Sequence, residues 1–177
     1  MVRKTKNQAD KTVLKAQNTP VVEELSTGMN EDATNEDAPI IDVKTDTQFT
    51  VLLEAQASKL SPKSIGHISF QLVRGPDNLI SIRLVANTSG GNFCKNPISL
   101  QSIITILEHQ TADKAFKSSI MKDVFIGKGS KSSNNTAFLI SALRSPDIGL
   151  IIPNDKSKFL SNISKDFADV ASKLLTQ

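Results

Sequence analysis

The chain has 177 residues with a net charge of +3, one cysteine and neither tryptophan nor tyrosine, and its length suits a single domain. A lone cysteine excludes an intramolecular disulfide, and the apolar runs are much shorter than the roughly 20 residues that cross a bilayer. We therefore expect a cytoplasmic protein with no membrane partner.

Residues 1–48 are rich in polar and charged side chains and contain no phenylalanine. Such a segment buries too little apolar surface to offset the loss of chain entropy, so we expect a disordered tail. Its first 15 residues carry a net charge of +4, whereas residues 23–46 carry −7. Two interpretations stay open: a solubilising extension, or an acidic segment that competes for a basic face or docks a partner.

The rest of the chain, residues 49–177, is its basic part. It holds 15 Lys and Arg side chains against 9 Asp and Glu, a net charge of +6. An excess of this size on one domain favours polyanionic partners, nucleic acid among them.

The first half of this domain, residues 49–110, has the pattern of strands followed by a helix. Strands are predicted at 49–56, 67–74, 79–87 and 93–98. Apolar residues alternate with mostly polar ones in the second and third of these, and the turn residues 75–78 lie between them, so the two form a hairpin. Ser99 is a suitable N-cap for a helix whose apolar residues recur at helical spacing, namely Leu100, Ile103, Ile104 and Leu107.

The second half, residues 119–177, is predicted to follow the same plan. Strands are expected at 120–126, 136–144 and 149–152, with a polar loop over 127–135 and a turn over 145–147. Asn154 or Asp155 is then predicted to cap a long amphipathic helix. Its apolar stripe is formed by Phe159, Ile163, Phe167, Val170 and Leu174.

The two halves also share a short motif, since the Arg-Gly-Pro-Asp at 74–77 is followed 70 residues later by Arg-Ser-Pro-Asp at 144–147. A repeated order of elements affects the fold more than any single motif does. The sequence therefore predicts an α+β fold made of two tandem antiparallel β-sheet units, 49–110 and 119–177, each closed by an amphipathic helix.

The hairpin at 67–87 and the strand-to-helix passage KNPISLQSIITILEHQ at 95–110 resemble the single-stranded-DNA-binding positive cofactor module. In that module a curved antiparallel sheet also ends in an Ile-Ser-Leu-like step into an amphipathic helix. The doubled arrangement resembles the Whirly proteins and the mitochondrial guide-RNA-binding proteins. This resemblance implies a homo-oligomer that assembles through its helices and binds single-stranded nucleic acid.

The motifs that carry catalysis or bind cofactors and metals are not found in the sequence. It contains no P-loop, no dinucleotide-binding glycine pattern, no metal-ligand spacing and no nucleophile elbow. Cys94 with His67 or His109 is compatible with a thiol and imidazole pair, but without a supporting motif a buried structural cysteine is the favoured interpretation. We expect no enzyme, no cofactor and no metal.

The leading hypothesis is a non-catalytic protein that binds single-stranded DNA through its phosphates, with little sequence preference. The alternatives are an RNA-binding protein of the same fold, or a protein assembly module that acts through its helices. Phosphate contacts are expected from basic residues on the outer faces and loops of the strands, and base stacking from two phenylalanines. The candidates are Lys63, Arg74, Arg83, Lys95, Lys122, Lys128, Lys131 and Arg144, with Phe93 and Phe125 for stacking.

Overall fold

The computed structural model describes residues 49–61, 63–129, 132 and 134–177. The predictions for the tail, 1–48, and for Lys131 lie outside the described residues. The described part is an α+β domain with one four-stranded and one three-stranded antiparallel sheet, which confirms the predicted class. None of its helices is long and apolar enough to cross a membrane.

The four-stranded sheet is built from the first half of the domain, and its strands follow one another in the order β1-β2-β3-β4. The first three confirm the predicted strands, while the fourth shares only Ile98 with the segment 93–98 predicted for it. The strands are β1 (Thr50–Ser58), β2 (His67–Arg74), β3 (Ile80–Asn87) and β4 (Ile98–Ser99).

The hairpin between β2 and β3 closes through the turn residues that predicted it. The Gly75 N–H donates to the Leu79 carbonyl at 2.9 Å, and the Asn78 N–H donates to the Gly75 carbonyl at 3.0 Å. Asn78 has a φ of 61°, a conformation that asparagine tolerates better than most residues. Local turn chemistry therefore sets this register.

Helix α1 (Leu100–Glu108) confirms both its predicted cap and its predicted face. The Ser99 hydroxyl accepts a hydrogen bond from the Ser102 N–H at 3.3 Å. The four apolar residues predicted to form its core face, Leu100 to Leu107, are all buried. Helical periodicity was sufficient here because the polar residues fall cleanly on the opposite face.

Two predicted strands of the second half are wrong. Residues 120–126 form parts of two short 3₁₀ helices, η1 (Ser118–Met121) and η2 (Asp123–Phe125). Residues 136–144 belong to helix α2 (Asn135–Arg144), which buries Leu139, Ile140, Ala142 and Leu143. A short apolar run suits a buried helix as well as a strand, and here the packing of α2 against β1 and β2 selects the helix.

The long helix predicted from Asn154 onward is also wrong in its first part. The segment forms a hairpin of β6 (Ile151–Asn154) and β7 (Ser157–Ile163), and only then α3 (Phe167–Leu175). The Asn154 side-chain oxygen accepts from the Lys156 N–H at 3.0 Å, the mark of an Asx turn. Asparagine favours such turns as much as helix caps, so its position alone did not separate the two outcomes.

The second half therefore does not repeat the first. An offset of 70 residues places β2 on α2, a strand on a helix. The three-stranded sheet has the order β5-β7-β6, with β5 (Phe116–Lys117) paired to β7.

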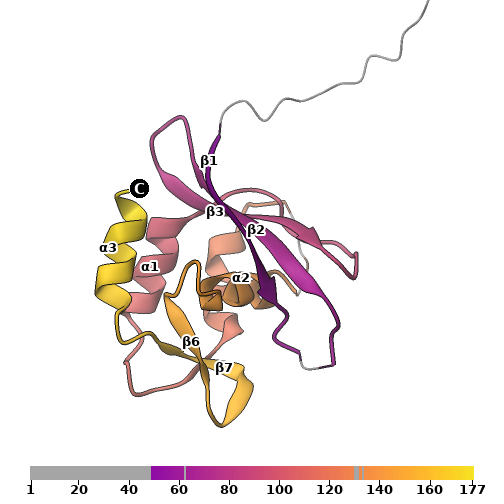
Figure 1. Cartoon of the computed structure of the whole chain (residues 1–177), viewed down its shortest axis with the longest axis vertical. Coiled ribbons are helices and arrows are strands. Elements are labelled where there is room, and N and C mark those ends of the chain that lie inside the picture. The colour runs from indigo at the N-terminus through magenta and orange to yellow at the C-terminus, as the bar shows by residue number, and fades with distance from the viewer. Residues whose placement is uncertain (1–48, 62, 130–131, 133) are drawn as a thin grey trace, which may run out of the picture. The chain divides into compact units, whose positions relative to one another are not determined.

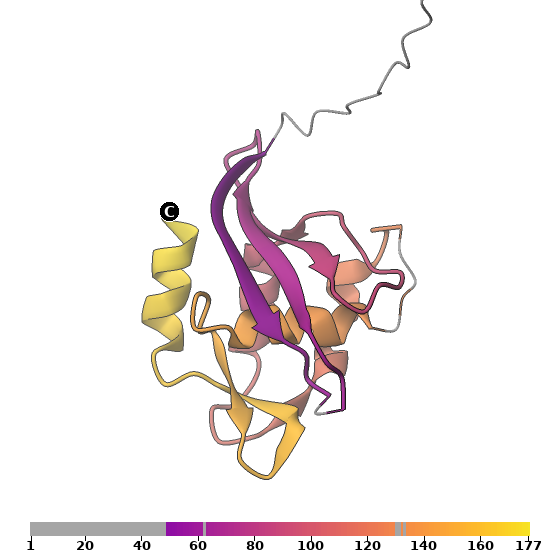
Figure 2. The ribbon, with the colours of Figure 1, turned by 45° about the vertical axis from the view of Figure 1, so that its right-hand side comes forward.

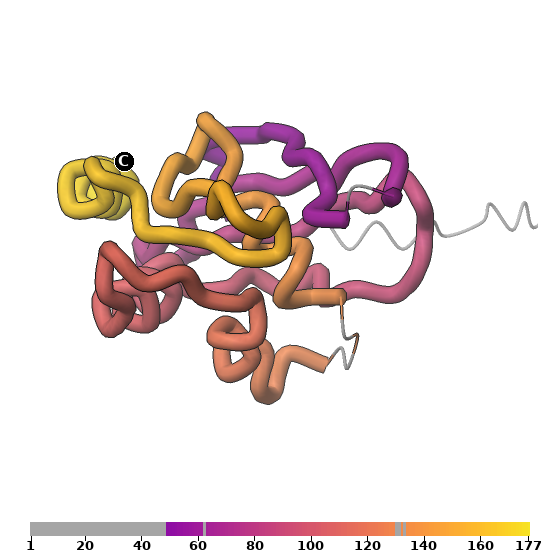
Figure 3. The backbone as a smooth tube through the Cα atoms, turned by 90° about the horizontal axis from the view of Figure 1, so that it is seen from below, coloured from indigo at the N-terminus to yellow at the C-terminus, as the bar shows by residue number. Residues whose placement is uncertain are grey.

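One core joins these elements. Helix α2 lies across the inner face of the four-stranded sheet, and α1 and α3 lie side by side at one edge of the domain (Figures 1 and 2). Figure 3 shows the same pair from below, with the β6–β7 hairpin beside it. The inner face of the sheet supplies the fully buried side chains Ile68, Phe70, Leu72, Ile82 and Leu84.

Deletion of residues 1–48 is expected to leave a cooperative thermal transition, because the described core cluster runs from Ala57 to Leu174. Removing a segment of net charge −3 should also strengthen polyanion binding at low salt. Calorimetry and binding titrations of the truncated chain check both points. A broad, non-cooperative melt would contradict the first, and unchanged affinity would contradict the second.

Candidate nucleic-acid interface

A groove of about 650 Å³ opens where chain segments from both halves of the domain meet. We call it the Phe159 groove. Its walls are the connection after β1 (residues 59–64), the end of β3 (residues 87–90), β5, the first turns of α2 and β7. The volume lies within the range of about 300–1,000 Å³ that is usual for ligand sites.

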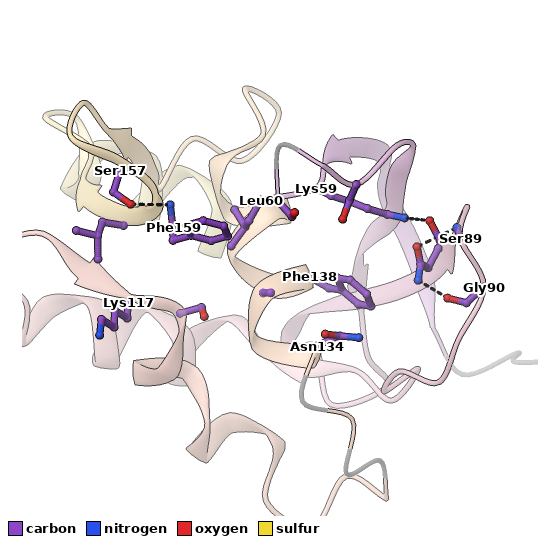
Figure 4. A pocket seen from close by; sticks show the side chains of 15 residues that line it. Lys59, Leu60, Ser89, Gly90, Lys117, Asn134, Phe138, Ser157 and Phe159 are labelled. Carbon is purple, nitrogen blue, oxygen red and sulfur yellow. Dashed lines mark hydrogen bonds between the residues drawn. The ribbon is translucent and has the colours of Figure 1, made fainter.

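The apolar part of the groove is aromatic. Phe159 from β7 is 57% exposed, an unusual exposure for a ring of this size. Phe138 enters from α2, and Leu60 lies between the two rings in Figure 4. The outer edge of Phe138 is supported by Phe93, whose ring centroid is 6.3 Å away at an interplanar angle of 77°. This T-shaped pair holds Phe138 in place.

Two lysines lie at the borders of the groove. The Lys59 ammonium donates to the Ser89 hydroxyl and to the Ile65 carbonyl, the latter at 3.3 Å, and so is held across one end (Figure 4). Lys117 on β5 is exposed at the other side. An ammonium has three donors, so the two bonds of Lys59 leave it able to contact an anion.

The residues that line the groove include no Asp, Glu, His or Cys among those that the structure describes. Its titratable side chains are therefore the two lysines, and its remaining polar groups are serine hydroxyls and asparagine amides. The groove combines positive charge with exposed ring surface. Its described lining residues include no carboxylate, imidazole or thiol to serve as acid, base or nucleophile.

Three of the residues predicted from the sequence lie near this groove. Lys63 is exposed in the β1–β2 connection, between the lining residues Ser61 and Ser64. Phe93 lies behind Phe138, and the Lys95 ammonium is 5.8 Å from the centre of the Phe93 ring. In this position Phe93 supports Phe138.

Two predicted arginines lie on the four-stranded sheet away from the groove. Arg74 is at the far end of β2, opposite Ile80. Arg83 lies on the outer face, where its guanidinium donates to the Gln71 side-chain oxygen at 2.8 and 3.2 Å and lies over Phe49. Gln71 in turn donates to the Glu54 carboxylate at 2.9 Å. A carboxylate in this row of side chains lowers its positive charge.

A third group, Lys122, Phe125 and Lys128, belongs to the region of η2. Lys122 is exposed, and Phe125 is half-buried against the core. Lys128 lines a separate cavity that also contains Asp123. The structure therefore divides the predicted residues among several surfaces instead of gathering them on one.

Arg144 is not the exposed strand residue that the sequence predicts. It lies at the end of α2, and its guanidinium donates to the Ser161 hydroxyl and to the carbonyls of Lys158 and Leu160 on β7, at 2.5 to 3.2 Å. Burial lowers the pKa of the guanidinium. Arg144 thus ties α2 to the three-stranded sheet.

Cys94 is buried, as predicted for a structural cysteine. Its thiol lies 3.5 Å from the Lys128 carbonyl, and its backbone N–H donates to the Asn135 side chain at 2.9 Å. The first contact ties the segment between β3 and β4 to the loop after η2, and the second ties it to the start of α2.

Replacing Ser141 with alanine is expected to stabilise the fold. Ser141 is 2% exposed, and its hydroxyl has no hydrogen-bond partner among the described residues. An unsatisfied buried hydroxyl costs about 1–3 kcal/mol, and alanine is also the better helix former. Urea denaturation in a phosphate-free buffer should show a gain of about 1 kcal/mol. A loss of that size would reveal a partner for the hydroxyl that this structure lacks.

Sequence reasoning missed the residues that define the groove, because they come from segments far apart in the chain. Lys59 and Lys117 stand next to predicted strands and carried no motif. The predicted helical stripe that contains Phe159 is wrong here, since Phe159 is an exposed residue of β7. The turn dipeptide Asn154-Asp155 was the one local signal that pointed to a hairpin here.

The fold and the groove together define an α+β protein with a basic, aromatic-lined groove. The chain matches no family model, and comparison with curated proteins and with solved structures finds no match. The chemistry of the groove is therefore the basis for a functional proposal.

Proposed function

We propose that this protein is a non-catalytic protein that binds single-stranded nucleic acid in the Phe159 groove. The observation that carries the proposal is the pairing of an exposed ring, Phe159, with two bordering lysines and no carboxylate among the described lining residues. Lys59 and Lys117 would contact phosphates, and the rings of Phe159 and Phe138 would stack with bases.

A single strand suits this groove better than a duplex. Bases expose their faces for stacking only where they are unpaired, and both rings of the groove offer apolar surface. The hydroxyls and amides around them, such as Asn134 and Ser157, have no fixed donor pattern for one base. Little sequence preference is therefore expected.

We favour DNA over RNA because the first half keeps the features that resemble the positive cofactor module. The meander β1-β2-β3-β4 passes through Ile98 and Ser99 directly into α1. On this order of elements we propose a relationship to that module and, more distantly, to Whirly proteins. The second half, with its different order of elements, does not add to that support. RNA stays the alternative, to be recognised by contacts to the 2′-hydroxyl.

Fluorescence anisotropy with labelled single-stranded DNA, single-stranded RNA and duplex DNA tests the proposal at two salt concentrations. Binding to the single strands that weakens with salt, and weaker binding to the duplex, is the expected result. Equal binding to the duplex would contradict the stacking role. No binding at low salt would overturn the proposal.

Changing Lys59 and Lys117 together to alanine is expected to weaken binding of single-stranded DNA for every sequence alike. Two lost phosphate contacts reduce the slope of log affinity against log salt by roughly 1.4, at about 0.7 per contact. If the two proteins bind equally at 1 M salt, this change of slope corresponds to about a 25-fold loss of affinity at 0.1 M salt. A salt titration of both proteins measures it.

The matched control is a double alanine variant of Lys165 and Lys173. Both are exposed and lie just before and within α3, and neither lines the groove. The control should keep the slope of the wild type. An equal loss in the control would mean diffuse attraction of charge without a defined site.

The second candidate is a protein assembly module, and one observation favours it. Helices α1 and α3 lie side by side and border a shallow cavity of about 570 Å³ whose apolar lining includes Ile104, Phe167 and Leu175. None of the large apolar side chains that are exposed in the described chain lies on either helix, so we place this candidate second. A homo-oligomer formed through these helices would appear as a multiple of the monomer mass in light scattering at tens of micromolar.

A further inference from the structure

A second cavity of about 390 Å³ adjoins the Phe159 groove and shares Lys59 and Leu60 with it as walls. We call it the Ser141 cavity. The end of β1, the helix α2 and the β6–β7 hairpin meet around it. The charged residues that line it are Lys59, Arg144 and Lys158, and none of its described lining residues is acidic.

The first sign of a ligand is the Ser141 hydroxyl. It belongs to the cavity wall and is almost wholly buried, yet it has no hydrogen-bond partner among the described residues. Buried polar atoms without partners are rare in native proteins, and each calls for an explanation such as a bound ion or water. A free hydroxyl in a cavity can donate to an acceptor that enters it.

The second sign is the charge of Arg144 in the same wall. Its four hydrogen bonds go to carbonyl and hydroxyl oxygens, all of them neutral. A guanidinium has five N–H donors, so one N–H on Nη1 is not used by these bonds. Desolvation lowers the pKa of Arg144, since burial disfavours the charged form of the guanidinium.

The nearest carboxylate along the chain, Asp147, does not neutralise this charge. It is exposed, and it accepts a hydrogen bond from the Ser145 hydroxyl at 2.7 Å. Three basic residues and the unpaired Ser141 thus line one cavity, and its described wall residues include no Asp or Glu. A tetrahedral anion with several acceptor oxygens matches this set of donors.

We propose that the Ser141 cavity binds a phosphate group of the nucleic-acid strand whose base occupies the adjoining Phe159 groove. This inference rests on the proposed function and deepens it. Ser141 donates to a phosphate oxygen, Lys158 and Lys59 flank the group, and the Arg144 guanidinium supplies positive charge from the wall. Lys59, shared by both spaces, lies between the phosphate and the base.

Two probes separate the cavity from the groove. The first is inorganic phosphate, applied against chloride of equal ionic strength, with the melting temperature as readout. The second is a labelled oligothymidylate of about ten nucleotides, within the usual site size of about 4–16. The variants are Ser141→Ala and Lys158→Ala, and Lys165→Ala serves as the control. Arg144 is left unchanged because it also holds α2 to β7.

Phosphate is expected to raise the melting temperature of the wild type and of the control above that in chloride. This rise should be smaller in Ser141→Ala and in Lys158→Ala than in the wild type. Ser141→Ala should also bind the oligothymidylate about tenfold more weakly, the usual effect of one hydrogen bond to a charged group. Lys158→Ala should reduce the salt slope by roughly 0.7.

An equal rise in the wild type and in Ser141→Ala would overturn the inference, since the anion would then act through general charge. If the wild type binds the oligothymidylate well and both variants bind it equally well, the inference is overturned. The proposed function is then unaffected. If phosphate raised the melting temperature through Ser141 but the wild type bound no oligothymidylate, the proposed function would be overturned. The inference that the phosphate belongs to a nucleic-acid strand would be overturned with it.

Discussion

Phe159→Ala is expected to weaken binding of single-stranded DNA by roughly fivefold to more than a hundredfold. Stacking of one base on an aromatic side chain contributes about 1–3 kcal/mol by alanine substitution, and each 1.4 kcal/mol corresponds to about tenfold in affinity. The loss should be the same at low and high salt, because the ring carries no charge. Anisotropy titrations at two salt concentrations measure both features.

The variant is informative because its fold should be little affected. Phe159 is 57% exposed, so truncation creates no closed cavity, and the β7 backbone keeps its pairing with β5 and β6. Leu79, 58% exposed at the β2–β3 turn, offers a control of nearly equal exposure outside the groove. Leu79→Ala should leave affinity unchanged. A similar loss in both variants would point to nonspecific apolar association.

A salt-independent loss for Phe159→Ala and a salt-dependent one for the Lys59 and Lys117 pair would separate stacking from phosphate contact. The two classes of contact are additive to a first approximation where their residues do not touch. If Phe159→Ala instead changed only the salt slope, the ring would be acting by positioning a lysine. That outcome would remove the base-stacking part of the proposal.

The first half of the domain could be predicted because its signals are local. Alternation in β2 and β3, the turn at residues 75–78 and the cap at Ser99 each specify a conformation over a few residues. The same is true of the buried face of α1. Each of these signals agrees with the packing that the tertiary structure provides.

The second half could not be predicted because its signals have two meanings. The apolar run 137–143 fits a strand or a buried helix, and only its contact with β1 and β2 decides. Phe159 and Ile163 are four residues apart, which suits a helical stripe, yet they belong to a strand, and Phe167 begins the next helix. Periodicity therefore joined two elements into one.

The candidate site was the least predictable part. The groove brings together residues that are far apart in the chain, namely Lys59, Lys117 and Phe159. The pairing of β5 with β7 brings Lys117 and Phe159 together, and the connection after β1 supplies Lys59. Counting charges along the chain did predict a basic domain. It could not show which of the 15 basic residues lie near an exposed ring or away from carboxylates.

Arg144→Ala is expected to lower the free energy of unfolding by about 2–4 kcal/mol, the largest effect on stability among the variants considered. The change removes four hydrogen bonds between α2 and β7. It leaves the fully buried Ser161 hydroxyl without those donors, and buried groups without partners cost about 1–3 kcal/mol each. Removal of the guanidinium also removes the cost of its desolvation, and this offsets part of the loss of stability. Urea denaturation with a fitted m-value gives the difference.

Arg144→Lys separates the contribution of the planar guanidinium geometry to stability from the contribution of its charge. A lysine ammonium keeps the charge but cannot reach the carbonyls of Lys158 and Leu160 and the Ser161 hydroxyl from one plane, so it should recover less than half of the lost stability. Arg83→Ala is the matched arginine control, since the Arg83 side chain bonds Gln71 on the outer face of the four-stranded sheet and does not join α2 to β7. Full recovery by lysine would mean that charge alone holds α2 to β7. An equal loss of unfolding free energy in Arg83→Ala and Arg144→Ala would mean that the link between α2 and β7 stabilises the fold no more than the outer-face contacts of Arg83 do.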